Sequence, residues 1–211
     1  MKPIVILGAG GFARELMALI EEIGGWKIMG FVRSDSQGEI SLLHGYSNYP
    51  NIDIFKRDHP DAVDVCYCFG AGSPRVKRTM DAEARLAGLI PAPPLVHPNV
   101  RIHASVQLSD TVVICAGTSL TVDIQIGYGT MLNLHCTVGH DTVIGAFCTC
   151  SPGVHLSGNV TVEDEVECGT NSSVIPKVTL GKRCVLGAGA VAVKSIRPGV
   201  VAVGIPAKPI G

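Results

Sequence analysis

Hydrophobic residues recur at every sixth position through the second half of the chain. Stepping by six from Val96 to Leu186, all sixteen positions are aliphatic or cysteine. A second set, four residues after each member of the first, is mostly small and runs from Val100 to Ala190. A period of six fits neither a helix nor a hairpin, because neither returns to the same face every six residues. The pattern predicts a solenoid of short parallel strands, with three hexapeptides in each coil and about five coils in all.

Glycine often follows the first position of the hexapeptide. The examples are Gly127, Gly139, Gly145, Gly181 and Gly187. The large aliphatic side chains should fill the interior of a triangular prism, with the small residues beside them near the corners. We expect glycines such as Gly139 and Gly145 to turn those corners.

Before residue 95 the periodicity changes to that of alternating strands and helices. Residues 2–7 read as a buried strand, and an amphipathic helix follows that ends at Gly24. Two more strands are expected in "KIMGFV" and "VDVCYCFG", a second helix from Pro74, and a short strand near residues 89–96. This order predicts a small parallel α/β sheet, a Rossmann-like half-domain over residues 1–95, followed by the solenoid over residues 96–211.

The turn "GAGGFA" satisfies G-x-G-x-x-G/A through Gly8, Gly10 and Ala13, with Gly11 beside them, between a strand and a helix. Backbone amides in such a loop can approach a phosphate at the positive end of the helix. A tight turn without a ligand is the alternative. About ninety residues give one mononucleotide-binding half, which suits a nucleotide-linked sugar better than NAD.

Three further residues are candidates for the same nucleotide-sugar site. Asp35 follows the second strand and can accept a ribose hydroxyl. Gly70 and Arg75 belong to a second strand-to-helix turn, "FGAGSPR", which can line the same pocket.

Composition excludes several classes of partner. The net charge of −1, with only 17% charged residues, argues against a nucleic-acid or membrane-surface partner. The N-terminal apolar run "IVIL" is too short for a signal sequence or a membrane span. Eight cysteines occur without a CxxC pair, and five occupy positions where the repeat requires a small apolar side chain. Reduced thiols and a cytoplasmic location are therefore expected.

His140 and Asp141 interrupt the solenoid pattern within "TVGHDTVIG". Neighbours on adjacent coils differ by eighteen residues, so His140 should stack between Val122 and Gly158, with its imidazole pointing outward. Asp141 should stack over Asp123 and is placed to orient the ring and raise its basicity. The alternative is an ordinary surface histidine on a turn.

A glycine-loop domain followed by a hexapeptide solenoid resembles the PglD/NeuD family of sugar acetyltransferases over essentially the whole chain. The resemblance implies a left-handed parallel β-helix and a role in glycan biosynthesis. It also implies that the matching "HD" pair, His140 and Asp141, provides the general base, while Gly158 in "SGN" donates an amide to the thioester carbonyl. Asn133 in "MLNLH" matches an asparagine that approaches the substrate. Thr149 stands where some members carry a second histidine.

The resemblance further implies acetyl-CoA as co-substrate, no metal, and a homotrimer with active sites between β-helices. The segments "GTNSSV", "GAGAVAVK" and "VAVGIPAKPI" resemble the cofactor segments of the family. They carry the expected cofactor-binding residues Gly169, Gly187, Gly189, Lys194, Pro206 and Lys208, in addition to Gly158. The closing segment can also simply cover the end of the prism.

The expected reaction is N-acetylation of a UDP- or GDP-linked 4-amino-deoxysugar, by direct transfer with a histidine base. O-acetylation of a sialic-acid-like sugar is the first alternative. A zinc enzyme resembling the β-helix carbonic anhydrases is a second, because His135 and His140 are five residues apart. That family has a histidine where Gly145 stands here. A non-catalytic sensor of sugar nucleotides is a third.

Overall fold

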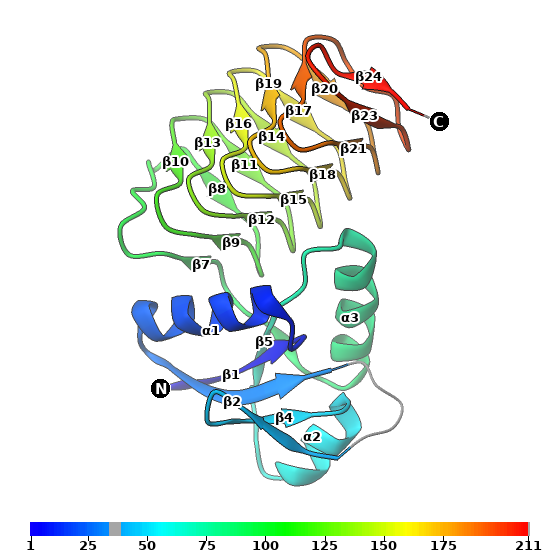
Figure 1. The fold of residues 1–211 in the computed structure, drawn as a ribbon. Coiled ribbons are helices and arrows are strands. Elements are labelled where there is room, and N and C mark those ends of the chain that lie inside the picture. Colours follow the sequence, from blue (N-terminus) through cyan, green and yellow to red (C-terminus); the bar gives the residue numbers. More distant parts are fainter. Residues whose placement is uncertain (34–38, 211) are drawn as a thin grey trace. The chain divides into compact units, whose positions relative to one another are not determined.

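In the computed structural model, residues 1–33 and 39–210 are described, and Asp35 lies outside them. The chain divides into two compact units, Met1–Leu95 and Val96–Gly211. Each unit has its own architecture (Figure 1).

The first unit is a six-stranded sheet with helices, in the strand order β3-β4-β2-β1-β5-β6. All of its pairs are parallel except the β3–β4 hairpin. Its elements are β1 (Lys2–Leu7), α1 (Gly11–Ile23), β2 (Trp26–Val32), β3 (Ser41–Leu43), β4 (Tyr46–Tyr49), α2 (Ile52–Asp58), β5 (Cys66–Phe69), α3 (Pro74–Leu86) and β6 (Ile90–Pro91).

The predicted strands and helices of this unit are present, but residues 41–58 add three elements that the sequence analysis did not assign. Strands β3 and β4 have three and four residues, and α2 has seven. Such short segments give too few repeats of either period to show a pattern. Helix α2 owes its start to Asn51, whose side chain accepts a hydrogen bond from the Ile54 amide at 3.0 Å.

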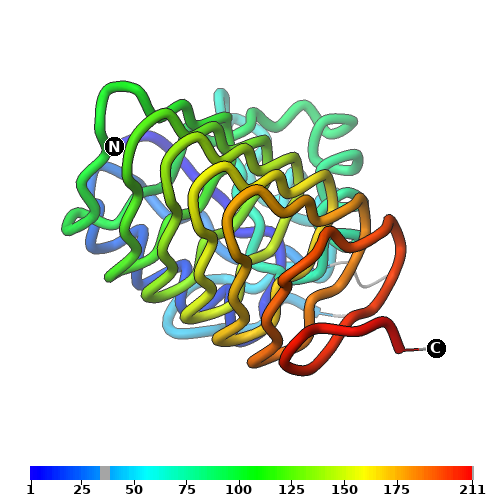
Figure 2. Tube along the Cα trace, turned by 90° about the horizontal axis from the view of Figure 1, so that it is seen from above, coloured from blue at the N-terminus to red at the C-terminus, as the bar shows by residue number. Residues whose placement is uncertain are grey.

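The second unit is a parallel β-helix built of two-residue strands, except for the three-residue β23, which pairs antiparallel with β24. Figure 2 shows its coils following one another along the axis. Three sheets have the orders β10-β13-β16-β19-β22, β20-β17-β14-β11-β8 and β24-β23-β21-β18-β15-β12-β9-β7. The strands are β7 (Leu95–Val96), β8 (Gln107–Leu108), β9 (Val113–Ile114), β10 (Ser119–Leu120), β11 (Gln125–Ile126), β12 (Met131–Leu132), β13 (Thr137–Val138), β14 (Val143–Ile144), β15 (Thr149–Cys150), β16 (His155–Leu156), β17 (Thr161–Val162), β18 (Glu167–Cys168), β19 (Ser173–Val174), β20 (Thr179–Leu180), β21 (Val185–Leu186), β22 (Val191–Ala192), β23 (Val201–Val203) and β24 (Lys208–Pro209).

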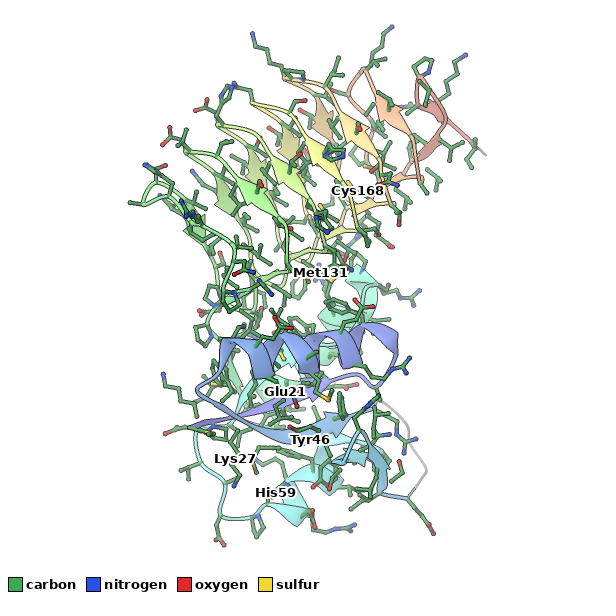
Figure 3. All side chains as sticks on the ribbon, turned by 60° about the vertical axis from the view of Figure 1, so that its left-hand side comes forward. Glu21, Lys27, Tyr46, His59, Met131 and Cys168 are labelled. Carbon is green, nitrogen blue, oxygen red and sulfur yellow. The ribbon has the colours of Figure 1, made fainter. Side chains whose placement is uncertain are left out.

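The register confirms the eighteen-residue coil. Leu120, Val138 and Leu156 are partners on successive strands. Most residues of both sets form one hydrophobic core, which includes Cys168 on β18 (Figure 3). The prediction is wrong at Ile102, which is 37% exposed. Residues 97–106 contain no strand, so the chain there does not carry Ile102 into the interior.

The corners are turned by a different position from the one predicted. A positive φ recurs every six residues from Thr111 to Gly189, and Asp141, with φ +58°, is one of these residues. Gly139 and Gly145 are not among them. Glycine is needed there because the next coil is close: a Cβ on Gly139 would lie 2.5 Å from the Gly158 nitrogen. The assignment of Gly139 and Gly145 to the corners is therefore corrected.

Candidate active site

His140 and Asp141 form a side-chain pair at one corner of the β-helix. The imidazole Nδ1 lies 2.7 Å from the Asp141 Oδ2, and the His140 side chain is 58% exposed. An ionised carboxylate only accepts hydrogen bonds, so Nδ1 carries the proton, and in the neutral imidazole Nε2 keeps a free lone pair. This is the arrangement that a general base requires.

The backbone fixes this corner on both sides. The Asp141 amide donates to the Val122 carbonyl at 3.2 Å, and the Asn159 amide donates to the His140 carbonyl at 2.7 Å. The expected stacking of the pair between adjacent coils is therefore observed. Asp123, Asp141 and Asn159 all have φ between +56° and +58°, so acidic and amide residues occupy successive turns of this corner.

Gly158 lies directly beside the imidazole. A Cβ built on Gly158 would be 2.5 Å from Nε2 of His140 and 2.7 Å from its Cε1. Among the backbone bonds of the described residues, none has the Gly158 N–H as donor. The structure thus brings together the three residues predicted for catalysis: a base, its carboxylate partner and a backbone amide.

Lys194 lies three coils beyond His140 at a shortened corner, because Val174 pairs with Ala192 eighteen residues on but Leu180 pairs with Ile196 sixteen residues on. Counting by eighteen from His140 through Gly158 and Pro176 leads to Lys194, three coils further on. At about 4.8 Å per coil, Lys194 is roughly 14 Å from His140 along the axis. Its side chain is exposed.

The other predicted cofactor residues gather in the C-terminal coils. A Cβ on Gly169 would lie 2.8 Å from the Gly187 carbonyl carbon, and one on Gly187 would lie 2.7 Å from Val203. Val203 pairs with Lys208 in the β23–β24 hairpin. Gly189 and Pro206 belong to the same C-terminal part of the chain and are exposed. A Cβ on Gly189 would meet open space.

Asn133 is not brought to the pair within one chain. It follows β12, on a different sheet from β13, and its Oδ1 accepts from the Leu134 amide at 2.7 Å. Thr149 lies on β15 of that same sheet and is buried. His135 occupies the preceding corner, where its ring lies against Gly117.

In the first unit, the two glycine turns meet at the carboxyl ends of β1 and β5. Gly8 has φ +115°, and a Cβ on it would lie 2.8 Å from the Gly70 carbonyl oxygen. A Cβ on Gly70 would in turn collide with Ala13 and Ile6. These two glycines therefore have a packing role that requires no ligand. Gly10 caps α1, and no side chain caps this helix end.

The remaining features of this edge offer room and positive charge. A Cβ on Gly10 would meet open space, and Arg75 is exposed in the first turn of α3. Lys77 is also in that turn but is only 1% exposed, which the sequence did not predict because a lysine in a helix is normally exposed. A narrow gap lies at the ends of β1 and β2. It shares Ile52 and Glu83 with a cavity of about 330 Å³.

All eight cysteines are buried, and none of them is in a disulfide. Burial raises the pKa of Cys136 to about 12 and that of Cys184 to about 11. It also raises the pKa of Cys68. A raised pKa means that the thiolate, which is the nucleophile, forms only at alkaline pH. A covalent acyl-cysteine mechanism is therefore disfavoured.

We predict that the native protein resists thiol reagents. At pH 8 a colorimetric disulfide reagent should modify fewer than one thiol per chain over several minutes, and all eight after unfolding in urea. Fast, stoichiometric modification of one native thiol with parallel loss of activity would contradict this assignment.

Within residues 1–33 and 39–210, no group of three or more histidine, cysteine, aspartate or glutamate side chains is arranged to hold a metal ion. His135 and His140 lie at different corners, separated by strand β13. None of the described helices is long and apolar enough to cross a membrane.

Comparison with known proteins agrees with both halves of the chain. The PglD N-terminal domain model matches residues 3–81, and the model of the hexapeptide repeat of succinyl-transferase matches residues 136–164 and 159–194. A Schizosaccharomyces pombe protein described as a candidate acetyltransferase is 45% identical over 58 residues, which is 28% of this chain and 28% of that protein.

Solved structures match over the full length. A histidine-to-asparagine variant of perosamine N-acetyltransferase from Caulobacter crescentus, in complex with CoA and GDP-perosamine, has a TM-score of 0.91 at 26% identity, covering 100% of this chain and 98% of that one. WeeI from Acinetobacter baumannii AYE has a TM-score of 0.87 at 26% identity, covering 100% of both chains. The acetyltransferase domain of PglB from Neisseria gonorrhoeae FA1090, in complex with acetyl coenzyme A, has a TM-score of 0.86 at 28% identity, covering 99% of both.

A Rossmann-like half-domain followed by a left-handed β-helix, with a histidine–aspartate pair at a corner, defines an acyltransferase of the hexapeptide-repeat class. The predicted fold class is confirmed. The N-terminal match narrows the comparison further: residues 3–81 match the PglD N-terminal domain, and a perosamine N-acetyltransferase matches the whole chain.

Proposed function

We propose that this protein transfers the acetyl group of acetyl-CoA to the amino group of a nucleotide-linked amino sugar. The observation that carries the proposal is the His140–Asp141 pair lying against Gly158. Similar structures support the substrate classes, because one was solved with CoA and GDP-perosamine and another with acetyl coenzyme A.

His140 acts first, as general base. Its Nε2 accepts a proton from the sugar amine while the amine nitrogen forms its bond to the thioester carbonyl carbon. Asp141 stabilises the resulting imidazolium through Nδ1, and the Gly158 N–H donates to the negatively charged carbonyl oxygen. His140 then returns the proton to the leaving sulfur as the carbon–sulfur bond breaks. The acetyl group moves directly to the amine, without a covalent enzyme intermediate.

The C-terminal coils are proposed to bind the rest of acetyl-CoA. Lys194 lies three coils from His140, roughly 14 Å along the axis, which is a distance from which a cation can reach the phosphates when the thioester is at His140. Gly169 and Gly187 allow the close approach of successive coils in this part of the β-helix. Gly189, Pro206 and Lys208 complete the proposed site.

The first unit is proposed to bind the nucleotide. The uncapped N-terminus of α1 at Gly10 and Gly11 can receive a phosphate. Arg75 adds positive charge at the neighbouring helix start. Gly8 and Gly70 shape this edge, and Asp35 and Asn133 remain predictions as substrate-binding residues.

We further propose a homotrimer in which active sites lie between β-helices. The exposed side chains of Val122, Ile175 and Val193 are 38–40% accessible and lie close to the column of His140. Light scattering after size-exclusion chromatography tests this: a mass of three chains is expected, and a monomer would overturn it.

An N-acetylated nucleotide sugar is an activated donor for glycosyl transfer. We therefore propose a role in glycan biosynthesis.

A binding screen followed by a turnover assay tests the proposed activity. Thermal-shift measurements with UDP-, GDP-, dTDP- and CMP-sugars should show a rise in melting temperature with one nucleotide class. The 4-amino-deoxysugar of that nucleotide, incubated with acetyl-CoA, should release free thiol at a rate that depends on both substrates. Binding without thiol release across the panel would instead indicate a sensor.

A further inference from the structure

We propose that the absent side chain of Gly158 positions the catalytic imidazole, in addition to the role of the Gly158 amide. The inference deepens the proposed function and rests on it for its catalytic consequence. Gly158 is thus a positioning residue for His140: its Cα provides the surface on which the ring lies while Nδ1 is bonded to Asp141.

The contact covers the whole reactive side of the ring. A Cβ on Gly158 would lie 2.5 Å from Nε2, 2.7 Å from Cε1 and 2.9 Å from Cδ2 of His140. All three distances are well below van der Waals contact, so even a methyl group excludes the ring from its present place. Because the ring is otherwise largely exposed, Asp141 and Gly158 define its orientation between them.

The rest of this column shows that glycine is not a general requirement of the fold there. The equivalent positions on the coils to either side are Val122 and Pro176, which both carry side chains. Gly158 is the member that directly follows His140, one coil on. The demand for glycine therefore comes from the imidazole and not from the packing of successive coils.

The backbone that carries the carboxylate cannot move with a displaced ring at low cost. Asp141 is held at φ +58°, and its amide donates to the Val122 carbonyl. A ring rotated away from an alanine at position 158 would therefore lose its bond to Oδ2. Nδ1 would then no longer be fixed as the protonated nitrogen, and Nε2 would no longer be fixed as the base.

Gly139 provides a contrast that separates two effects. A Cβ there would meet backbone atoms, the Gly158 nitrogen at 2.5 Å and the Ser157 carbonyl carbon at 2.7 Å. Backbone cannot move aside as a side chain can, so Gly139→Ala should reduce stability. Gly158→Ala meets only a movable side chain, and its effect on stability should be small.

The test compares Gly158→Ala with the wild type and with Gly127→Ala. Gly127 follows β11 at the same repeat position as Gly139, and a Cβ there would meet only backbone, at 2.6 Å from the Gly145 carbonyl carbon. Nitrogen-15 NMR of histidine-labelled protein without substrate should show the Nδ1–H tautomer of His140 in the wild type and in Gly127→Ala. Gly158→Ala should show a mixture of tautomers while its melting temperature stays close to that of the wild type.

Turnover gives the second readout. Gly158→Ala keeps the backbone N–H. Any loss of kcat in this variant therefore reports the displaced imidazole and not a missing amide. A fall in kcat of about 100-fold, with the KM for acetyl-CoA unchanged, is expected from an error of about 1 Å in the position of the base. Gly127→Ala should retain wild-type kcat.

The two readouts separate a failure of the positioning role of Gly158 from a failure of the proposed acetyl transfer. An unchanged His140 tautomer in Gly158→Ala, or unchanged kcat in that variant, would overturn the positioning role. The NMR readout needs no substrate. A changed tautomer in a protein that acetylates no sugar nucleotide would therefore support the positioning role and count against the proposed reaction.

Discussion

Replacing His140 with alanine should lower kcat by about 10²- to 10⁴-fold, the range expected for loss of a general base. The attacking amine would then have no group to accept its proton as the new carbon–nitrogen bond forms. The KM for acetyl-CoA should change little, because the pantetheine and phosphate contacts are assigned to the C-terminal coils. Initial rates of thiol release with both substrates saturating measure kcat directly.

His103→Ala is the matched control. His103 is an exposed histidine whose Nδ1 is also bonded locally, to the Ser105 Oγ at 2.9 Å, but it lies in the strand-free segment before β8. Its removal should leave turnover unchanged. Asp141→Asn should lower kcat less than His140→Ala does, because the amide oxygen can still accept a hydrogen bond from Nδ1. It should still lower kcat, because the amide carries no charge to stabilise the imidazolium. Wild-type turnover in His140→Ala would remove His140 from the mechanism.

The β-helix could be predicted from the sequence because its period is directly visible. The sixth-residue positions predict both the buried set and the stacking of His140 next to Gly158. The conformation of the corners could not be read in the same way. Many residue types occupy the positive-φ position, among them Asp141, Phe147 and Lys177, so composition does not mark it. The glycines that do stand out, such as Gly139, serve the close approach of backbones.

The candidate site was predictable in its members but not in its geometry. Spacing shows that His140 points outward and that Gly158 is its neighbour. It does not show that the ring lies on the Gly158 Cα, because that depends on side-chain torsion angles. Counting places Lys194 three coils beyond His140, but it does not show that the spacing shortens to sixteen residues between Leu180 and Ile196. The buried Lys77 could not be found, because a lysine in a helix is normally exposed.

Ile144→Ala should produce the largest loss of stability among the substitutions considered, about 2–5 kcal/mol in the free energy of unfolding. Ile144 is 1% exposed and packs in the prism core, where it pairs with Ile126 and Val162 on the adjacent coils. Its truncation removes buried apolar surface and leaves a cavity between coils. Because each coil packs mainly on its neighbours, a defect in the coil that carries His140 weakens the contacts on both sides.

Val143→Ala is the control on the same strand, β14. Val143 points outward and is 41% exposed, so its truncation should change the free energy of unfolding by no more than about 0.5 kcal/mol. Urea unfolding followed by circular dichroism gives both values from the transition midpoints. Equal losses of unfolding free energy in the two variants would contradict the burial pattern along β14, in which Val143 points outward and Ile144 points inward. The outward direction assigned to His140 would then be wrong as well, because it depends on the same hexapeptide register.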